Sequence, residues 1–203
     1  MLLINDLSFK RLSTNIFSDI NISASPGKII HIKGRNGSGK TTLLKTILNI
    51  LEPSNGEVFW MGKNIKKNLS NLYNSTTFIM DKKTSTREIT VLENIHFWKK
   101  FSSSSMSIDQ IDKLLNLLSL KDYINKKVMN LSLGEIKKLE LARLIIEQKK
   151  LWILDEPFSE LDKQSIEIIE ETFLDHVEKR GIIIFTSHYE VEIRKIEKIN
   201  LTK

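Results

Sequence analysis

Residues 34–41 read Gly-Arg-Asn-Gly-Ser-Gly-Lys-Thr, between a short apolar run at 29–32 and a helix-like stretch at 42–51. A strand, a glycine-rich turn and a helix start form the context in which a G-x-x-x-x-G-K-[ST] pattern binds nucleotide phosphates. The glycines permit positive φ, so several backbone N–H groups can surround phosphate oxygens, and the helix start adds a partial positive charge. The sequence therefore predicts a nucleoside triphosphate site at this turn.

The two residues that follow the last glycine give this prediction its specificity. Lys40 can reach the β- and γ-phosphates, and the Thr41 hydroxyl is placed to bind Mg²⁺. An ordinary glycine-rich turn between a strand and a helix would not require Lys-Thr at this point. We expect contacts to ATP from nine residues: Gly34, Arg35, Asn36, Gly37, Ser38, Gly39, Lys40, Thr41 and Thr42.

Two acids follow the apolar run at 151–154. In nucleotide-binding α/β sheets the ligand lies beyond the carboxyl ends of the strands, so this placement brings Asp155 near the phosphates. There its carboxylate can hold Mg²⁺ together with Thr41. Glu156, one residue further on, can orient and polarise an attacking water as a general base. An acidic strand end alone is common, and the upstream phosphate-binding turn favours the catalytic interpretation.

A histidine follows the next apolar run, at 182–185. An isolated histidine is more often structural, and we interpret His31, His96 and His176 in that way. A functional role is favoured for His188, because its strand is the next one along the chain after Asp155 and Glu156. We therefore expect His188 to point into the same cleft.

The segment 131–135 reads Leu-Ser-Leu-Gly-Glu and precedes an amphipathic stretch. Ser132 and Glu135 have the S-x-x-E spacing of a capping box at a helix start. A capped helix start with a serine hydroxyl and the backbone N–H of Gly134 is also a phosphate-binding surface. We call Ser132, Gly134 and Glu135 the Ser132 tip.

The order of the expected elements indicates an α/β fold. Segments 2–9 and 16–22 are expected to be β segments before the turn at Pro26-Gly27. From residue 29 onward strands alternate with helices, which favours a mainly parallel core sheet. Around 84–140 the pattern becomes helical, with a capping box at Ser107 and Gln110 before an apolar face of Ile108, Ile111, Leu114, Leu115 and Leu118. We expect one domain, 1–203, with a helical subdomain at about 84–140.

Composition restricts the class and location of the protein. The 203 residues are 40% hydrophobic, no apolar run is long enough for a membrane span, and the start lacks signal-peptide features. No cysteine occurs, which is compatible with a reducing compartment. The net charge of +6 divides into +8 for residues 1–100 and −2 for 101–203. A general lysine bias explains this better than nucleic acid does, with proximity to a membrane as the second explanation.

Four motifs in this order resemble the ATP-binding subunits of ABC transporters: 34–41, 131–135, the L-W-I-L-D-E-P segment 151–157, and His188. The resemblance spans nearly the whole chain. It implies a P-loop ATPase, with Asp155 in the Mg²⁺ site, Glu156 as the base and His188 as the switch residue. It further implies a head-to-tail homodimer in which the Ser132 tip of one copy contacts the ATP of the other.

A narrower resemblance concerns the haem exporter ATP-binding subunits of cytochrome c maturation. The strings 34–37, 90–97, 151–158 and 161–164 are similar to that family, as is Arg rather than Pro at position 35. This likeness implies an ATPase for haem export or release in c-type cytochrome biogenesis. It also implies an integral membrane permease as partner and a peripheral location on the cytoplasmic face of the inner membrane.

Two positions depart from the family pattern. The glutamine-loop position falls at about Lys82, which cannot bind Mg²⁺ as Gln can, so either Asp81 substitutes or the metal relies on Thr41 and Asp155. The adenine-stacking aromatic falls near Arg11, whose guanidinium can stack on a ring. The alternatives are a soluble ABC ATPase acting on ribosomes or nucleic acid, the ATPase of another small-substrate transporter, and a module that binds ATP without turnover.

Overall fold

The computed structural model describes residues 1–80, 83–188, 191, 193 and 196–201, which form two sheets and six α-helices. One sheet is antiparallel and contains β1 (Leu2–Arg11), β2 (Thr14–Ala24), β4 (Asn55–Trp60) and β5 (Lys63–Asn64). The other is parallel and contains β3 (Ile29–Lys33), β6 (Thr76–Ile79), β7 (Leu151–Leu154), β8 (Ile182–Thr186) and β9 (Ile196–Asn200). The α-helices are α1 (Lys40–Ile47), α2 (Leu69–Asn74), α3 (Val91–Phe101), α4 (Ile108–Leu117), α5 (Leu133–Ile146) and α6 (Lys163–Glu178). Short 3₁₀ helices lie at Ile65–Lys67, Lys121–Tyr123 and Val128–Asn130.

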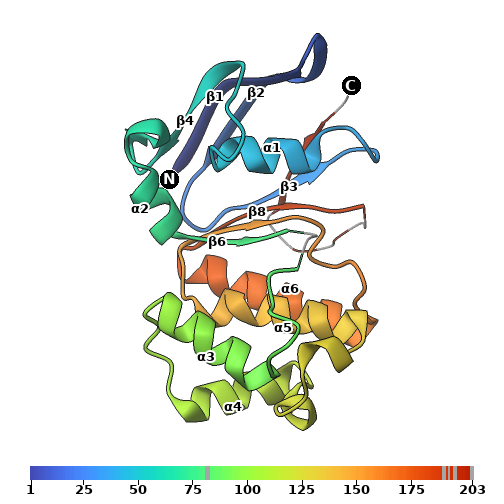
Figure 1. Ribbon diagram of the computed structural model, residues 1–203. Helices are drawn as coiled ribbons and strands as arrows, with labels where there is room; N and C mark the ends of the chain where they lie inside the picture. Colours follow the sequence, from blue (N-terminus) through green and yellow to red (C-terminus); the bar gives the residue numbers. More distant parts are fainter. Residues whose placement is uncertain (81–82, 189–190, 192, 194–195, 202–203) are drawn as a thin grey trace.

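These elements stack in layers (Figure 1). The antiparallel sheet, with strand order β2-β1-β4-β5, lies over α1, and α1 lies over the parallel sheet. The parallel sheet has the order β6-β7-β8-β3-β9, and its other face is covered by α5 and α6, with α3 and α4 beyond them. The predicted α/β class, with a mainly parallel core sheet and antiparallel N-terminal strands, is confirmed.

The parallel sheet is buried on both faces because alternate side chains of a strand point to opposite sides. In β8, Ile182 and Ile184 join the core below the antiparallel sheet, whereas Ile183 and Phe185 join the core of the helical layer. The same alternation divides the residues of β7 between the two cores. The sheet is therefore held from both sides, and the carboxyl ends of its strands have fixed positions.

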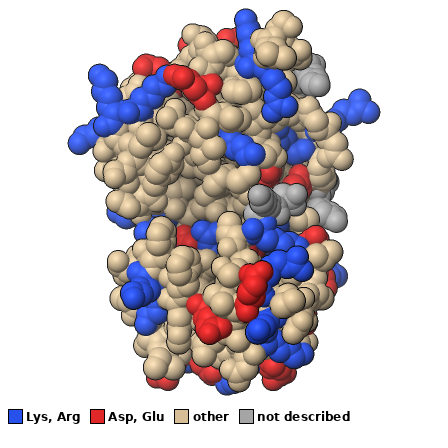
Figure 2. All heavy atoms as spheres, viewed as in Figure 1, with Lys and Arg blue, Asp and Glu red and all other residues tan. Residues whose placement is uncertain are grey.

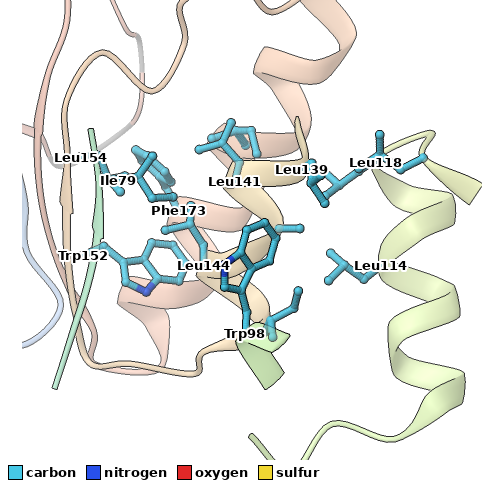
Figure 3. Packing of buried hydrophobic residues seen from close by; sticks show 14 of the residues in the cluster. Ile79, Trp98, Leu114, Leu118, Leu139, Leu141, Leu144, Trp152, Leu154 and Phe173 are labelled. Carbon is cyan, nitrogen blue, oxygen red and sulfur yellow. The ribbon is translucent and has the colours of Figure 1, made fainter. Parts of the chain in front are cut away.

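The helix α5 lies in the middle of the helical layer (Figure 3). It contributes Leu139, Leu141 and Leu144 to a buried cluster shared with strands β6 and β7 and helices α3, α4 and α6. Each of these three leucines is at most 1% exposed. Leu114 and Leu118 approach α5 from the α4 side in the same view. Any displacement of α5 would therefore disturb several elements at once.

Most expected elements occur where the sequence places them, and α6 occupies 163–178. The helix α1 is shorter than expected and stops at Ile47, because Asn49 takes a left-handed conformation with φ 54°. One residue of the predicted apolar face is not buried: Ile108, the first residue of α4, is 80% exposed. The capping box at Ser107 and Gln110 is confirmed.

The elements that were not expected include α2 and the edge strand β9. Three of the five residues of β9, Ile-Glu-Lys-Ile-Asn, are polar, which suits an edge strand but also resembles a surface loop. No helix in the described part of the chain is long and apolar enough to cross a membrane. The division into one domain with a helical subdomain at about 84–140 stays a prediction.

Candidate nucleotide-binding site

The turn between β3 and α1 curls around the amine of Lys40. This amine donates a 2.9 Å hydrogen bond to the carbonyl oxygen of Gly34 and lies 3.4 Å from that of Arg35. Gly37 and Gly39 have φ of 76° and 100°, in the left-handed region that favours glycine. A Cβ at Gly39 would also lie 2.6 Å from a methyl carbon of Ile16 in β2. Position 39 thus requires glycine for two reasons: its φ is positive, and a side chain there would collide with Ile16.

Several polar groups of this turn fit a bound phosphate. The helix α1 begins without a side-chain cap, so its first N–H groups and the partial charge of its dipole face the turn. The hydroxyl of Ser38, a residue only 5% exposed, has no hydrogen-bond partner among the described residues. Arg35 and Asn36 are exposed on the outside of the turn. Together with Lys40, these groups can hold a triphosphate.

Asp155 lies at the end of β7 and contacts the start of α1. Its Oδ2 accepts a 2.6 Å hydrogen bond from the hydroxyl of Thr41, and its Oδ1 accepts one of 2.7 Å from the hydroxyl of Thr186. The carboxylate is 3% exposed. Hydroxyl and carboxylate oxygens are the ligand types that Mg²⁺ prefers. The structure thus brings the two predicted metal ligands together, and their oxygens fit a magnesium ion beside the phosphate-binding turn.

Glu156, His188 and Lys40 meet at one point. The ring nitrogen Nε2 of His188 lies 3.1 Å from Oε1 of Glu156, and the backbone N–H of His188 donates a 3.1 Å bond to Oε2. The amine of Lys40 is 3.8 Å from Oε1 of Glu156 and 3.4 Å from His188 Nε2. A carboxylate held in this way can accept a proton from a water molecule at the edge of the phosphate site.

Two residues that sequence reasoning missed hold the acids in place. The hydroxyl of Thr186 accepts a 3.0 Å bond from the backbone N–H of Glu156 while it donates to Asp155. The amine of Lys137, on α5, donates a 2.7 Å bond to the carbonyl oxygen of Glu156. Thr186 could have been found, because it ends the strand adjacent to β7 and precedes His188 by two residues. No sequence pattern marks Lys137 as a contact of Glu156, because its only recognisable feature is its position on the helix that follows Ser132.

The Ser132 tip forms the N-terminus of α5. The backbone N–H of Ser132 donates a 2.7 Å bond to the Glu135 carboxylate, and the Ser132 hydroxyl accepts a 3.3 Å bond from the Glu135 N–H. The predicted capping box is therefore confirmed. The bond from the Ser132 N–H also holds the pKa of Glu135 below its usual value. A Cβ at Gly134 would lie 2.9 Å from the carbonyl oxygen of Glu160, so the tip packs against the loop before α6.

The structure does not join the Ser132 tip to the phosphate-binding turn of the same chain. In the described part of the chain, Ser132 and Glu135 bond to each other and to none of residues 34–42. Arg11, the expected adenine-stacking residue, is exposed at the tip of the β1–β2 hairpin, where it pairs with Thr14. The glutamine-loop position at Lys82, with the neighbouring Asp81, lies outside the described residues.

A phosphate-binding turn before α1, an acid pair at the end of β7 and a parallel sheet with β3 beside β8 define a P-loop nucleoside triphosphatase. The model of the family described as ABC transporter matches residues 17–159. The chain belongs to this ABC transporter family and is an ATP-binding, ATP-hydrolysing protein of that family.

Individual relatives agree with this assignment. Over 203 residues the chain is 32% identical to the cytochrome c biogenesis ATP-binding export protein CcmA of Vibrio vulnificus strain YJ016, with 99% of each chain covered. Among solved structures, it is similar to a putative ABC transporter ATP-binding protein from Pyrococcus furiosus, at 27% identity and a TM-score of 0.86, covering 98% of this chain and 96% of that one. It shares its fold with the dimeric bacterial cassette MJ0796, at 19% identity and a TM-score of 0.80, covering 99% and 95%.

Proposed function

We propose that this chain is the ATPase subunit of an ABC exporter that acts in c-type cytochrome biogenesis, with haem as the exported or released substrate. The full-length similarity to a cytochrome c biogenesis export protein supports this assignment. The meeting of Lys40, Glu156 and His188 beside the phosphate-binding turn supports ATP hydrolysis as its chemistry.

In this proposal residues 34–42 bind the triphosphate of ATP. The Lys40 amine exchanges its carbonyl partners for phosphate oxygens, and the N–H groups of the turn surround the same oxygens. Thr41 and Asp155 hold Mg²⁺, which when bound neutralises phosphate charge. Glu156 takes a proton from the attacking water at its carboxylate, and His188 orients that carboxylate and contacts the terminal phosphate.

The proposed active unit is a homodimer. The Ser132 tip presents backbone N–H groups and a hydroxyl at a helix N-terminus, a surface that suits phosphate oxygens. Because it does not bond to the phosphate-binding turn of its own chain, we assign it to the ATP held by a second copy. One cassette that shares this fold was solved as a dimer. The permease partner and a peripheral site on the cytoplasmic face of the inner membrane belong to the same proposal.

The face of the molecule shown in Figure 2 does not favour a nucleic-acid partner. On the face shown in Figure 2, lysines and arginines are interspersed with acidic side chains and form no single continuous patch. Backbone recognition of nucleic acid requires such a patch or stripe. This face thus gives no support for action on ribosomes or nucleic acid, and the full-length similarity to an export protein favours the transporter function.

The decisive variant is Glu156→Gln, which keeps the shape of the side chain and loses the proton acceptor. We expect normal ATP binding, hydrolysis reduced at least about 100-fold, and accumulation of an ATP-dependent dimer in size-exclusion chromatography. Hydrolysis at the parent rate would remove Glu156 from its proposed role. Purification of the parent chain from native membranes, with identification of the bound integral protein, tests the cytochrome role: a permease for an unrelated substrate would overturn it.

A further inference from the structure

A buried carboxylate lies two turns into α5 and contacts the segment that follows β6. Glu140 is 2% exposed. Its oxygens accept three hydrogen bonds, from the backbone N–H of Thr84 at 2.7 Å, the Thr84 hydroxyl at 2.6 Å and the backbone N–H of Ser85 at 2.5 Å. The helical layer around it is apolar, so an acid at this position needs these three donors. Glu140 therefore fixes the main chain of 84–85 to α5.

Neighbouring groups complete the contact. The guanidinium of Arg143 lies 3.7 Å from Glu140 and donates a 2.8 Å bond to the same Thr84 hydroxyl. It also pairs at 2.7 Å with Glu147, which accepts a 2.8 Å bond from Thr77 in β6. The helix is thus attached to β6 through Glu147 and, separately, to the segment after β6 through Glu140.

The segment 83–85 also reaches the loop beside the Ser132 tip. Lys83 pairs with Glu160 at 3.1 Å, and the Glu160 carbonyl oxygen packs against Gly134 in the first turn of α5. Ser132 precedes Glu140 by eight residues, about 12 Å along a rigid helix at 1.5 Å per residue. The orientation of the tip is thereby tied to the end of β6, the strand next to the one that carries Asp155.

We propose that Glu140 is a positioning residue that holds the Ser132 tip in the orientation needed to meet ATP on a second copy of the chain. This inference rests on the proposed function of the tip. A buried polar network fixes the relative orientation of the elements it joins, because all of its hydrogen bonds are satisfied in one arrangement only. An apolar residue at position 140 would fill the layer but would remove all three Glu140 bonds and leave the bond from Arg143 to Thr84 to join α5 to 84–85.

The test uses the full chain in the Glu156→Gln background, where ATP-dependent dimers should accumulate. Glu140→Gln keeps the volume of the side chain and one oxygen for the N–H groups of Thr84 and Ser85, but it replaces the acceptor of the Thr84 hydroxyl with a donor and removes the negative charge beside Arg143. We expect the ATP concentration for half-maximal dimer formation to rise about tenfold, a typical cost of misplaced groups at a site. Affinity of the monomer for a fluorescent ATP analogue should change less than about twofold, because residues 34–42 are unaffected.

The matched control is Glu147→Gln, a buried acid at the C-terminal cap of α5 whose partners are Arg143 and Thr77 in β6 rather than the main chain of 84–85. Both variants should lower thermal stability, but dimer formation should weaken mainly in Glu140→Gln. Equal dimer formation by Glu140→Gln and its Glu156→Gln parent, or equal losses in the two α5 variants, would overturn the proposal. If Glu140→Gln does not fold, Thr84→Val removes the same hydroxyl contact and should act in the same direction. Absence of ATP-dependent dimers in the Glu156→Gln parent would instead contradict the proposed function.

Discussion

His188 lies against both carboxylate oxygens of Glu156: its backbone N–H donates a 3.1 Å hydrogen bond to Oε2, and its ring nitrogen Nε2 lies 3.1 Å from Oε1. The two residues come from the ends of adjacent parallel strands, β8 and β7. The hydrogen bond to Oε2 restrains rotation of the carboxylate, while Oε1 has no hydrogen-bond partner among the described residues. The geometry therefore presents the proposed base in one orientation before any substrate arrives, which reduces the reorganisation needed during reaction.

Replacement of Lys40 by alanine should weaken nucleotide binding itself. A hydrogen bond to a charged group contributes about 1.5–3 kcal/mol, so the dissociation constant for ATP should rise roughly 10- to 100-fold. Equilibrium titration with a fluorescent ATP analogue measures this change. Lys45→Ala, in the last turn of the same helix, is the control and should leave affinity near the parent value. Undiminished affinity in Lys40→Ala would contradict the proposed phosphate contact.

Asp155→Asn should change the metal requirement of the reaction. The amide keeps an oxygen and the shape of the side chain but removes the negative charge that attracts Mg²⁺. We expect the Mg²⁺ concentration for half-maximal ATP hydrolysis to rise about tenfold or more. Asp162→Asn is the matched control, because Asn caps a helix as well as Asp does and this residue caps α6. An unchanged Mg²⁺ dependence would remove Asp155 from the metal site.

Thr186→Val should slow hydrolysis without weakening ATP binding. The substitution keeps the branched shape but leaves a buried oxygen of Asp155 and the N–H of Glu156 without their shared partner, at a cost of about 1–3 kcal/mol in unfolding free energy. We expect kcat to fall about tenfold as the two acids lose their alignment. Thr186→Ser restores the hydroxyl and should recover most of the rate. If Val and Ser variants have the same rate, the hydroxyl bridge has no role in turnover.

The pH dependence of stability should contain a contribution from His176. This ring stacks on Trp152, with centroids 3.6 Å apart, and burial lowers its pKa from 6.5 to about 4. Because the folded pKa is lower, the unfolded chain binds the proton more readily between pH 6.5 and 4. The contribution of neutral His176 to the free energy of unfolding is fully present above pH 6.5. It is lost as pH falls toward 4, and the loss amounts to at most about 3 kcal/mol.

Urea unfolding from pH 7 to pH 4.5 measures this contribution. In His176→Phe the slope of stability against pH should become shallower, because the titrating group is gone. His96→Gln is the control, since His96 is exposed on α3 and its replacement should leave the slope unchanged. An identical slope in the parent and His176→Phe proteins would contradict the assigned burial.

The parts of the site that the sequence predicts are those with local signals. The turn at 34–41 and the capping box at Ser132 and Glu135 are encoded within a few residues, so their structure follows from spacing alone. The position of Asp155 follows from the rule that ligands lie at the carboxyl ends of parallel strands.

The remaining contacts depend on packing between distant elements. Thr186 bridges the two acids because β7 and β8 pair in a register that no local pattern specifies. Glu140 looks like a surface residue of an amphipathic helix, but α5 is covered on several sides and Glu140 is buried. Ile108 shows the opposite case. Its spacing places it on the apolar face of α4, but as the first residue of the helix it is exposed.

The bond from Lys137 to the carbonyl of Glu156 has a consequence for communication within a pair of copies. Glu156 sits in a left-handed conformation, φ 48°, and its main chain is held by the same helix whose first turn would serve the opposite nucleotide. A shift of α5 would therefore displace the main chain of Glu156 in the same copy of the chain. Through this one ammonium group, the occupancy of one ATP position could be sensed at the other.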